Sequence, residues 1–341
     1  RKMQEIERHI MESGTSIRGS VEHEHRKNGT SAWISTSKVP VWNRDGHIVG
    51  TFGISRDITR QKEMEIRSAR YADEIRDIKE QMEDEVEMAS ELQKSFFPKF
   101  YPVFPAGVHP QDSCIEFLHQ HHPLGMISGN LCSIRSVSST EVGIFLFDVV
   151  GSGVRAALIS SLAWALQEEI ALEEMDDPGS FLQHLNSHLF PILCDSEDRS
   201  SASACYLVFN TETGRIKFSS AGSPVPFLFR STNSSAEELM LTPFSIGPDL
   251  ASRKNVDYRT FETTISAGDS IVMYTSGICN VIGSDKEVFG SKRLLEVASK
   301  NVGRELFCIF PALLNAARDF SVNGEFDDDI SLVGFKWKGR G

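Results

Sequence analysis

Four short polar segments, far apart along the chain, each follow or end an apolar run that is typical of a β-strand. They cover residues 128–130, 147–153, 274–277 and 327–331. Strands that end at one edge of a sheet bring distant residues together, so we expect these segments to converge on one polar site. The last two-thirds of the chain should therefore form one domain in which distant segments contribute strands to the same β-sheet core.

The composition limits the class of protein. The 341 residues suffice for two domains of about 100–200 residues each. The net charge of −12 argues against nucleic acid and against anionic membranes as partners. We find no secretory leader and no apolar stretch near the roughly 18 residues of a membrane span. The six cysteines are scattered without a Cys-x-x-Cys pair, which predicts reduced thiols in a cytoplasmic protein. Because the first residue is Arg, we expect the chain to be a fragment of a longer protein.

Residues 1–60 contain a hairpin pattern. Alternation over residues 31–42 and 48–55 predicts two strands, joined by a turn at Asn43-Arg44-Asp45-Gly46. Together with Arg56-Asp57-Ile58-Thr59, this stretch resembles the C-terminal half of a PAS sensor domain. The alternative is a hairpin that only caps the following helix.

Residues 61–97 are highly charged and contain no Pro or Gly, which predicts a helix that extends to about Phe96. A stripe at alternating spacings of three and four predicts a coiled coil. Its members are Met64, Ser68, Tyr71, Ile75, Ile78, Met82, Glu85, Ala89, Leu92 and Phe96. We expect a homodimer through residues 64–96; the alternative is a single helix lying on another core.

After Pro98 the pattern changes to short strands and amphipathic helices, which predicts an α/β (α+β) sandwich of mixed sheets with helices outside. The expected strands are 141–150, 202–209, 215–220, 225–230, 257–265, 270–274 and 330–337. The expected helices are 156–174, 180–193, 291–299 and 304–320.

Asp148 ends a strand beside a glycine-rich turn, and Asp328 and Asp329 precede the last strand. Carboxylates in such places suit Mg²⁺ or Mn²⁺, which prefer hard oxygen ligands. Two such ions sharing a water can orient it on a phosphoryl group. A strand-terminal Asp is also a common turn or helix cap, so each residue alone is a weak signal.

Taken together, the segments resemble the SpoIIE/RsbU-type branch of the PPM protein serine/threonine phosphatases. The resemblance runs from about Met88 to Lys336 and keeps the family's motif order. Its motifs are Ala89–Pro98, Gly129-Asn130, Asp148-Val149-Val150-Gly151-Ser152-Gly153, Ala221-Gly222-Ser223-Pro224, Tyr274-Thr275-Ser276-Gly277 and Asp328-Asp329-Ile330-Ser331. The resemblance implies a PPM-type αββα sandwich over residues 98–341.

The resemblance also implies a role for each site position. Asp148 would bridge two Mn²⁺ or Mg²⁺ ions, the Val149 carbonyl would be a backbone ligand, and Asp328 would hold the second ion. Asn130 and Ser276 stand where the family has its other two carboxylates. Metal affinity depends on ligand charge, so we expect catalysis to be weak or absent.

The implied task is removal of phosphate from a serine of an anti-sigma-factor antagonist, with the helix relaying the state of the sensor. The alternative is a pseudophosphatase that binds the same phosphoprotein, or its kinase, without hydrolysis.

Two competing patterns are weaker. Gly151-Ser152-Gly153 after a strand fits part of a dinucleotide fingerprint, but the expected second strand falls inside a helical pattern. His119 and His121 share a strand face, but no cysteine or carboxylate nearby has zinc-ligand spacing. We interpret the second as a partly exposed strand.

Overall fold

The computed structural model describes residues 2–26, 29–170, 174–194, 200–239, 245–247 and 256–340. The chain divides into two compact units, Arg1–Glu83 and Asp84–Gly341. Among the described residues, no helix combines the length and the apolar character needed to span a bilayer.

The first unit is an antiparallel sheet in the order β1-β2-β3, with a helix packed on it. Its elements are α1 (Lys2–Ser13), β1 (Ile17–His25), β2 (Ser31–Trp42) and β3 (Ile48–Asp57). The predicted hairpin is confirmed, since β2 pairs with β3. The Asn43 side chain forms its turn by accepting hydrogen bonds from the backbone N–H groups of Asp45 and His47. The sequence patterns did not predict α1 or β1; α1 is held by the fully buried Ile10 and a Glu7–Lys38 ion pair.

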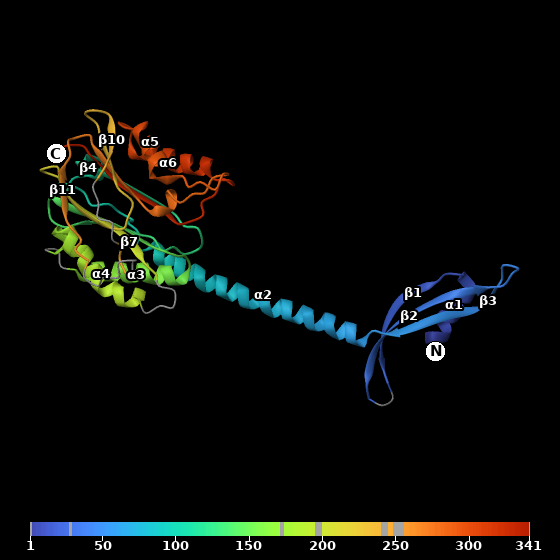
Figure 1. Ribbon diagram of the computed structural model, residues 1–341. Helices are drawn as coiled ribbons and strands as arrows, with labels where there is room; N and C mark the ends of the chain where they lie inside the picture. The colour runs from blue at the N-terminus through green and yellow to red at the C-terminus, as the bar shows by residue number, and fades with distance from the viewer. Residues whose placement is uncertain are drawn as a thin grey trace. The chain divides into compact units, whose positions relative to one another are not determined.

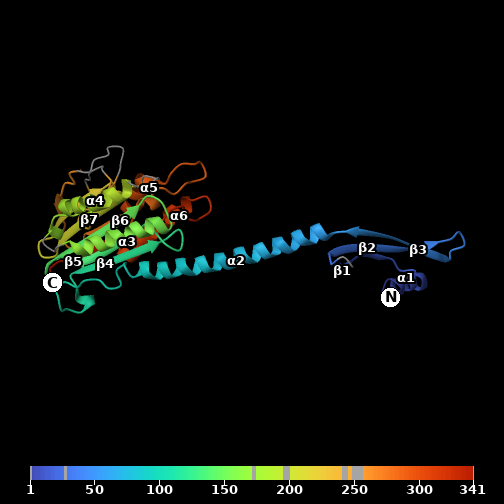
Figure 2. The same cartoon turned by 90° about the horizontal axis from the view of Figure 1, so that it is seen from below.

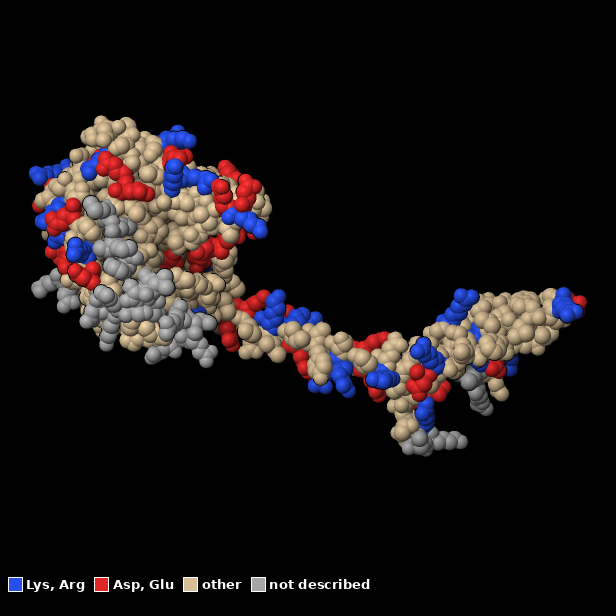
Figure 3. Space-filling view, in the orientation of Figure 1, with Lys and Arg blue, Asp and Glu red and all other residues tan. Residues whose placement is uncertain are grey.

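Helix α2 (Thr59–Lys94) confirms the predicted charged helix, although it ends two residues before Phe96. Asp57 caps its N-terminus by accepting a hydrogen bond from the backbone of Thr59. Acidic and basic side chains alternate along its surface, and several pair across one turn (Figure 3). Its apolar stripe is exposed: Met64, Tyr71, Ile75, Ile78, Met82 and Leu92 are each more than half accessible. Phe96 is not a member of this stripe, because it stacks on Trp164 of the second unit with ring centroids 4.7 Å apart.

The second unit contains two five-stranded sheets, with strand orders β10-β9-β12-β13-β4 and β11-β8-β7-β6-β5. The first sheet comprises β4 (Ile115–His122), β9 (Phe227–Arg230), β10 (Ser235–Glu238), β12 (Ser270–Tyr274) and β13 (Ile330–Trp337). The second comprises β5 (Leu131–Ser136), β6 (Glu141–Val149), β7 (Ala202–Asn210), β8 (Arg215–Ala221) and β11 (Phe261–Thr264). The expectation of mixed sheets was wrong, since all pairings between these named strands are antiparallel.

Two pairs of helices cover the outer faces of the sheets (Figures 1 and 2). Helices α3 (Val154–Glu169) and α4 (Pro178–Cys194) pack on the β5–β8 side, and α5 (Gly290–Ser299) and α6 (Leu306–Phe320) pack on the other sheet. This arrangement confirms the αββα sandwich. The predicted helix 156–174 ends earlier than expected, at Glu169, and residues 171–173 lie outside the described part.

Three apolar clusters separate the four layers. One lies between α3, α4 and the β5–β8 sheet, a second lies between the two sheets, and a third lies under α5 and α6. The middle cluster includes alternate residues of β6, such as Val142, Ile144 and Leu146, while Phe145 and Phe147 face the helices. Because β6 is buried on both faces, its sequence is an almost continuous apolar run that ends at Asp148.

Candidate functional site

The two sheets meet at one edge of the sandwich through a side-chain contact. Asp148 lies near the end of β6, and Ser276 opens the 3₁₀ turn η3 (Ser276–Ile278) that follows β12. The Ser276 hydroxyl lies 3.1 Å from Oδ2 of Asp148 and donates a hydrogen bond to it. Two segments that are 128 positions apart are thus in direct contact.

Asn130 is fully buried beside this contact. It precedes β5, and the next residue, Leu131, pairs with Phe147, the neighbour of Asp148. Its Nδ2 donates to the hydroxyls of Thr275, at 3.3 Å, and Ser331, at 3.1 Å. Its Oδ1 is buried and has no partner in the described structure. The side chain of Asn130 therefore links the two sheets, and its carbonyl oxygen keeps an unused hydrogen-bond acceptor.

The adjacent Asp328 and Asp329 have different surroundings. Asp329 is buried and accepts three hydrogen bonds: from the Ser128 hydroxyl at 2.7 Å, the Gly129 N–H at 2.9 Å and the Leu124 N–H at 2.7 Å. Asp328 is half-buried and, among the described residues, accepts only the N–H of Asp329, at 2.8 Å. Asp329 therefore fixes the loop, while Asp328 keeps acceptor capacity.

Two glycines permit the close approach of these segments. A Cβ on Gly129 would lie 3.1 Å from the carbonyl oxygen of Val149, and one on Gly277 would collide with the carbonyl oxygen of Asp329. The Val149 carbonyl, a predicted ligand, therefore lies against the Gly129-Asn130 segment. The structure brings all five predicted site residues to this edge; their roles as ligands remain a prediction.

The electrostatics of the site are dominated by burial and by like charge. Burial and the neighbouring carboxylates of Asp328 and Asp329 raise the pKa of Asp148, and the hydrogen bond from Ser276 lowers it; the net result is a pKa of about 7. Burial also raises the pKa of Asp328. The charged groups that act on these two carboxyls are themselves carboxylates. Like charge therefore adds to burial in disfavouring the ionised form of both carboxyls.

This donor set does not fit a pair of divalent ions. A two-ion centre needs several carboxylates to offset the charge of the ions. Metal affinity decreases when negatively charged ligands are lost. Here Ser276 supplies a hydroxyl that is already donated to Asp148, and Asn130 supplies a neutral amide oxygen. Within the described ranges, no group of three His, Cys, Asp or Glu side chains is placed to hold a metal ion.

Gln93, in the last turn of α2, is a site neighbour to which sequence reasoning gave no role. Its Oε1 accepts the N–H of Ser128 at 2.9 Å, and its Nε2 donates to the Ser128 carbonyl at 2.5 Å and to the Ser160 hydroxyl at 3.2 Å. It is buried, whereas most of α2 is exposed. The end of α2 is thereby bonded to the segment that carries Asn130. The sequence signal was the motif Ala89–Pro98, which contains Gln93 but did not indicate its hydrogen bonds.

The histidines of β4 are engaged in protein contacts. His121 lies 2.9 Å from the Ser331 hydroxyl through Nδ1 and is stacked on Phe97, and burial lowers its pKa to about 4. His119 bonds the Tyr101 hydroxyl at 2.8 Å. The interpretation of this segment as a strand is confirmed, and these contacts leave the zinc alternative without support.

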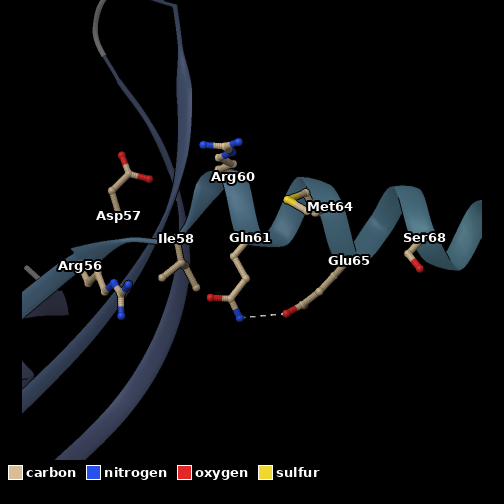
Figure 4. Close-up of a pocket in the computed structure, with 8 residues that line it drawn as sticks. All are labelled: Arg56, Asp57, Ile58, Arg60, Gln61, Met64, Glu65 and Ser68. Carbon is tan, nitrogen blue, oxygen red and sulfur yellow. Dashed lines mark hydrogen bonds between the residues drawn. The ribbon is translucent and has the colours of Figure 1, made fainter.

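A hollow lies in the first unit at the start of α2 (Figure 4). Eight residues line it: Arg56, Asp57, Ile58, Arg60, Gln61, Met64, Glu65 and Ser68. Their side chains point in different directions, and the hydrogen bond drawn among them joins Gln61 to Glu65 on the helix surface. The polar groups do not converge, so we assign no chemistry to this hollow.

Comparison with known proteins identifies the family. A model described as Stage II sporulation protein E (SpoIIE) matches residues 138–338, more than half of the chain. The chain belongs to the SpoIIE family. A model described as PAS fold matches residues 2–63. Both resemblances that the sequence suggested are therefore confirmed.

The relatives of this SpoIIE-family chain include named phosphatases. Phosphoserine phosphatase RsbU of Bacillus subtilis (strain 168) is 20% identical over 263 residues, covering 76% of this chain and 72% of RsbU. Phosphoserine phosphatase RsbP of the same strain is 25% identical over 160 residues, covering 46% of this chain and only 38% of RsbP. The SiaA-PP2C domain of Pseudomonas aeruginosa aligns with a TM-score of 0.61 at 19% identity, over 76% of this chain and 98% of that domain. That last similarity is one of fold.

Proposed function

We propose that the second unit acts on a phosphoserine protein of the anti-sigma-factor antagonist type in the cytoplasm, and that its metal-dependent hydrolysis is strongly weakened. The named phosphoserine phosphatases among its relatives support the substrate class. One observation carries the weakening: Ser276 donates a hydrogen bond to Asp148 where the family pattern has a carboxylate.

The reason is electrostatic. A pair of Mn²⁺ or Mg²⁺ ions brings four positive charges, and Asp148 and Asp328 offset only two of them. Bonds from outside the ligand set orient ligands but add no charge to them, so the contacts of Asn130 with Thr275 and Ser331 do not replace what is missing. We therefore expect the ions to bind weakly and hydrolysis to be slow.

The first experiment measures release of phosphate from a phosphoserine protein in millimolar Mn²⁺. We expect turnover far below that of RsbU assayed in parallel. Robust turnover that Asp148→Asn abolishes would show that the centre is intact and that the weakening is wrong.

The second experiment restores charge with Asn130→Asp and Ser276→Asp together. We expect Mn²⁺ to raise the melting temperature of the double variant and to leave the parent chain unchanged. The matched control is Ser284→Asp, at an exposed position in the loop after β12. If the double variant gains no metal binding, the assignment of Asn130 and Ser276 as ligand positions is wrong.

A second candidate function is a pseudophosphatase that binds the phosphoprotein or its kinase without hydrolysis. The loss of charge at two ligand positions favours it, because Asn130 has a neutral amide and the Ser276 hydroxyl is donated to Asp148. Metal content in Mn²⁺ separates the candidates: two ions favour the enzyme and none favours the binder.

We also propose that α2 joins two copies of the chain as a parallel coiled coil. The exposed Ile75, Ile78 and Met82 lie at helical spacing with no cover in one chain. Ile78→Pro should reduce the mass measured by light scattering from two chains to one. Lys79→Ala, at the neighbouring exposed position, is the control. An unchanged mass in Ile78→Pro would show that the helix does not hold the subunits together.

A further inference from the structure

Helix α4 carries two histidines on the side opposite its apolar contacts. Leu185 and Leu189 are fully buried and anchor the helix, whereas His184 is half-buried and His188 is exposed. The two residues are four positions apart, so their side chains are neighbours on the helix surface. Their rings are stacked, with centroids 4.5 Å apart and an angle of 26° between the planes.

The hydrogen bonds of His188 select one form of its ring. Its Nδ1 lies 3.0 Å from the backbone carbonyl oxygen of His184 and 3.1 Å from the Ser187 hydroxyl. A carbonyl oxygen only accepts, so Nδ1 must carry a proton and donate it. In the neutral ring the lone pair is then on Nε2, on the far side from the helix backbone. A histidine that binds a metal commonly has this arrangement, with one ring nitrogen donating to a carbonyl and the other coordinating the ion.

We propose that His184 and His188 form a two-ligand site for a borderline divalent cation, with Cu²⁺ bound more tightly than Ni²⁺ or Zn²⁺. Imidazole suits these ions, and the affinity of such sites rises toward Cu²⁺ in the first transition row. The other coordination positions are taken by water, since the described residues offer no group of three ligating side chains. Mg²⁺ and Mn²⁺, which prefer oxygen ligands, bind poorly at this site.

This site is independent of the proposed phosphatase centre. It uses nitrogen rather than oxygen ligands, and it lies on an outer helix rather than at the sheet edge (Figure 1). An ion held by both rings links two successive turns of α4, and α4 packs on β7 and β8. Binding therefore stabilises the folded second unit by mass action.

The test is calorimetric titration of the full chain, free of any purification tag, with CuCl₂ and then with MgCl₂. Loss of a residue that only hydrogen-bonds a metal ligand already costs about 10-fold in metal affinity. Loss of a ligand itself, in His184→Gln or His188→Gln, should therefore weaken Cu²⁺ binding by at least that factor. Cu²⁺ should also raise the melting temperature of the parent chain and not that of either variant.

The matched control is a second pair of exposed histidines, His23 and His25 on β1, whose rings meet edge-on at 5.0 Å. The double variant His23→Gln, His25→Gln should retain the tight Cu²⁺ site. If His184→Gln and His188→Gln bind Cu²⁺ as the parent chain does, or if the control pair accounts for the binding, the proposal is wrong. A circular dichroism spectrum equal to that of the parent chain establishes that each variant is folded.

Discussion

The polar edge of the sandwich contains two regions with opposite character. The first region is the loop framework, formed by Leu124, Ser128 and Gly129 around Asp329. Its three donors lie within 2.9 Å of the Asp329 carboxylate, and Gln93 bonds both backbone groups of Ser128. In the neighbouring ligand positions, Asp148 is half-buried beside the like charges of Asp328 and Asp329, and Asn130 keeps an unsatisfied oxygen. The framework is satisfied without a metal, and the ligand positions are not. Interactions that build this fold are therefore separable from the charges that would hold ions.

Removal of Asp329 should have the largest effect. Asp329→Ala leaves the Ser128 hydroxyl and the backbone N–H groups of Leu124 and Gly129 without an acceptor in a buried place. We expect the free energy of unfolding to fall by about 4 kcal/mol, measured by urea denaturation. Asp327→Ala, at the exposed neighbouring position, should change it little. Equal effects of the two variants would contradict a special role for the framework.

Asp148→Asn should act in the opposite direction and depend on pH. The pKa of Asp148 is about 7 in the folded chain, against 3.8 for an ordinary Asp, so the folded state holds a proton that the unfolded state releases. Stability from this group is complete below pH 4 and is lost as the pH rises toward 7 and above. At pH 8 in EDTA we expect Asp148→Asn to be more stable than the parent by about 3 kcal/mol. At pH 4 the two should coincide; a parent chain whose stability does not fall between these pH values would refute the burial of this charge.

Gln93→Ala tests whether the framework extends to α2. The variant removes the acceptor of the Ser128 N–H and the donor to the Ser128 carbonyl. We expect a loss of about 2 kcal/mol in the free energy of unfolding of the second unit. Glu91→Ala, on the exposed face of the same turn, is the matched control. Slower hydrogen exchange at Ser128 in the variant than in the parent would run against this assignment.

Ser276→Ala should have the smallest effect. It removes one hydrogen bond to Asp148, which raises the pKa of that carboxyl further. We expect a loss of about 1 kcal/mol at pH 8, where the carboxylate is charged. At pH 4, where it is protonated, the loss should be smaller. A loss as large as that of Asp329→Ala would place Ser276 in the framework instead.

Much of the fold was predictable because its signals are local. Alternation and the Asn43–Gly46 turn gave the β2–β3 hairpin, and three-four spacing gave α2. The sequence patterns missed α1, β1, β5 and the short strand β10. The residues of β1 and β10 are mostly polar and none is buried, so these two strands carry little apolar period. Sheet direction was also mispredicted, since an apolar run such as β6 fits parallel and buried antiparallel strands alike.

The candidate site divides in the same way. The sequence by itself determined its chemistry: Asp148 and Asp328 are retained, and Asn130 and Ser276 are neutral, whatever the fold. Only the tertiary structure decided that Ser276 bonds Asp148, that Asp329 rather than Asp328 fixes the loop, and that Gln93 holds Ser128. The identity of each side chain is given by its own position in the sequence. Its burial and its hydrogen-bond partners depend on which distant strand ends are packed together. The pKa of Asp148 is therefore a property of the assembled edge and not of its motif.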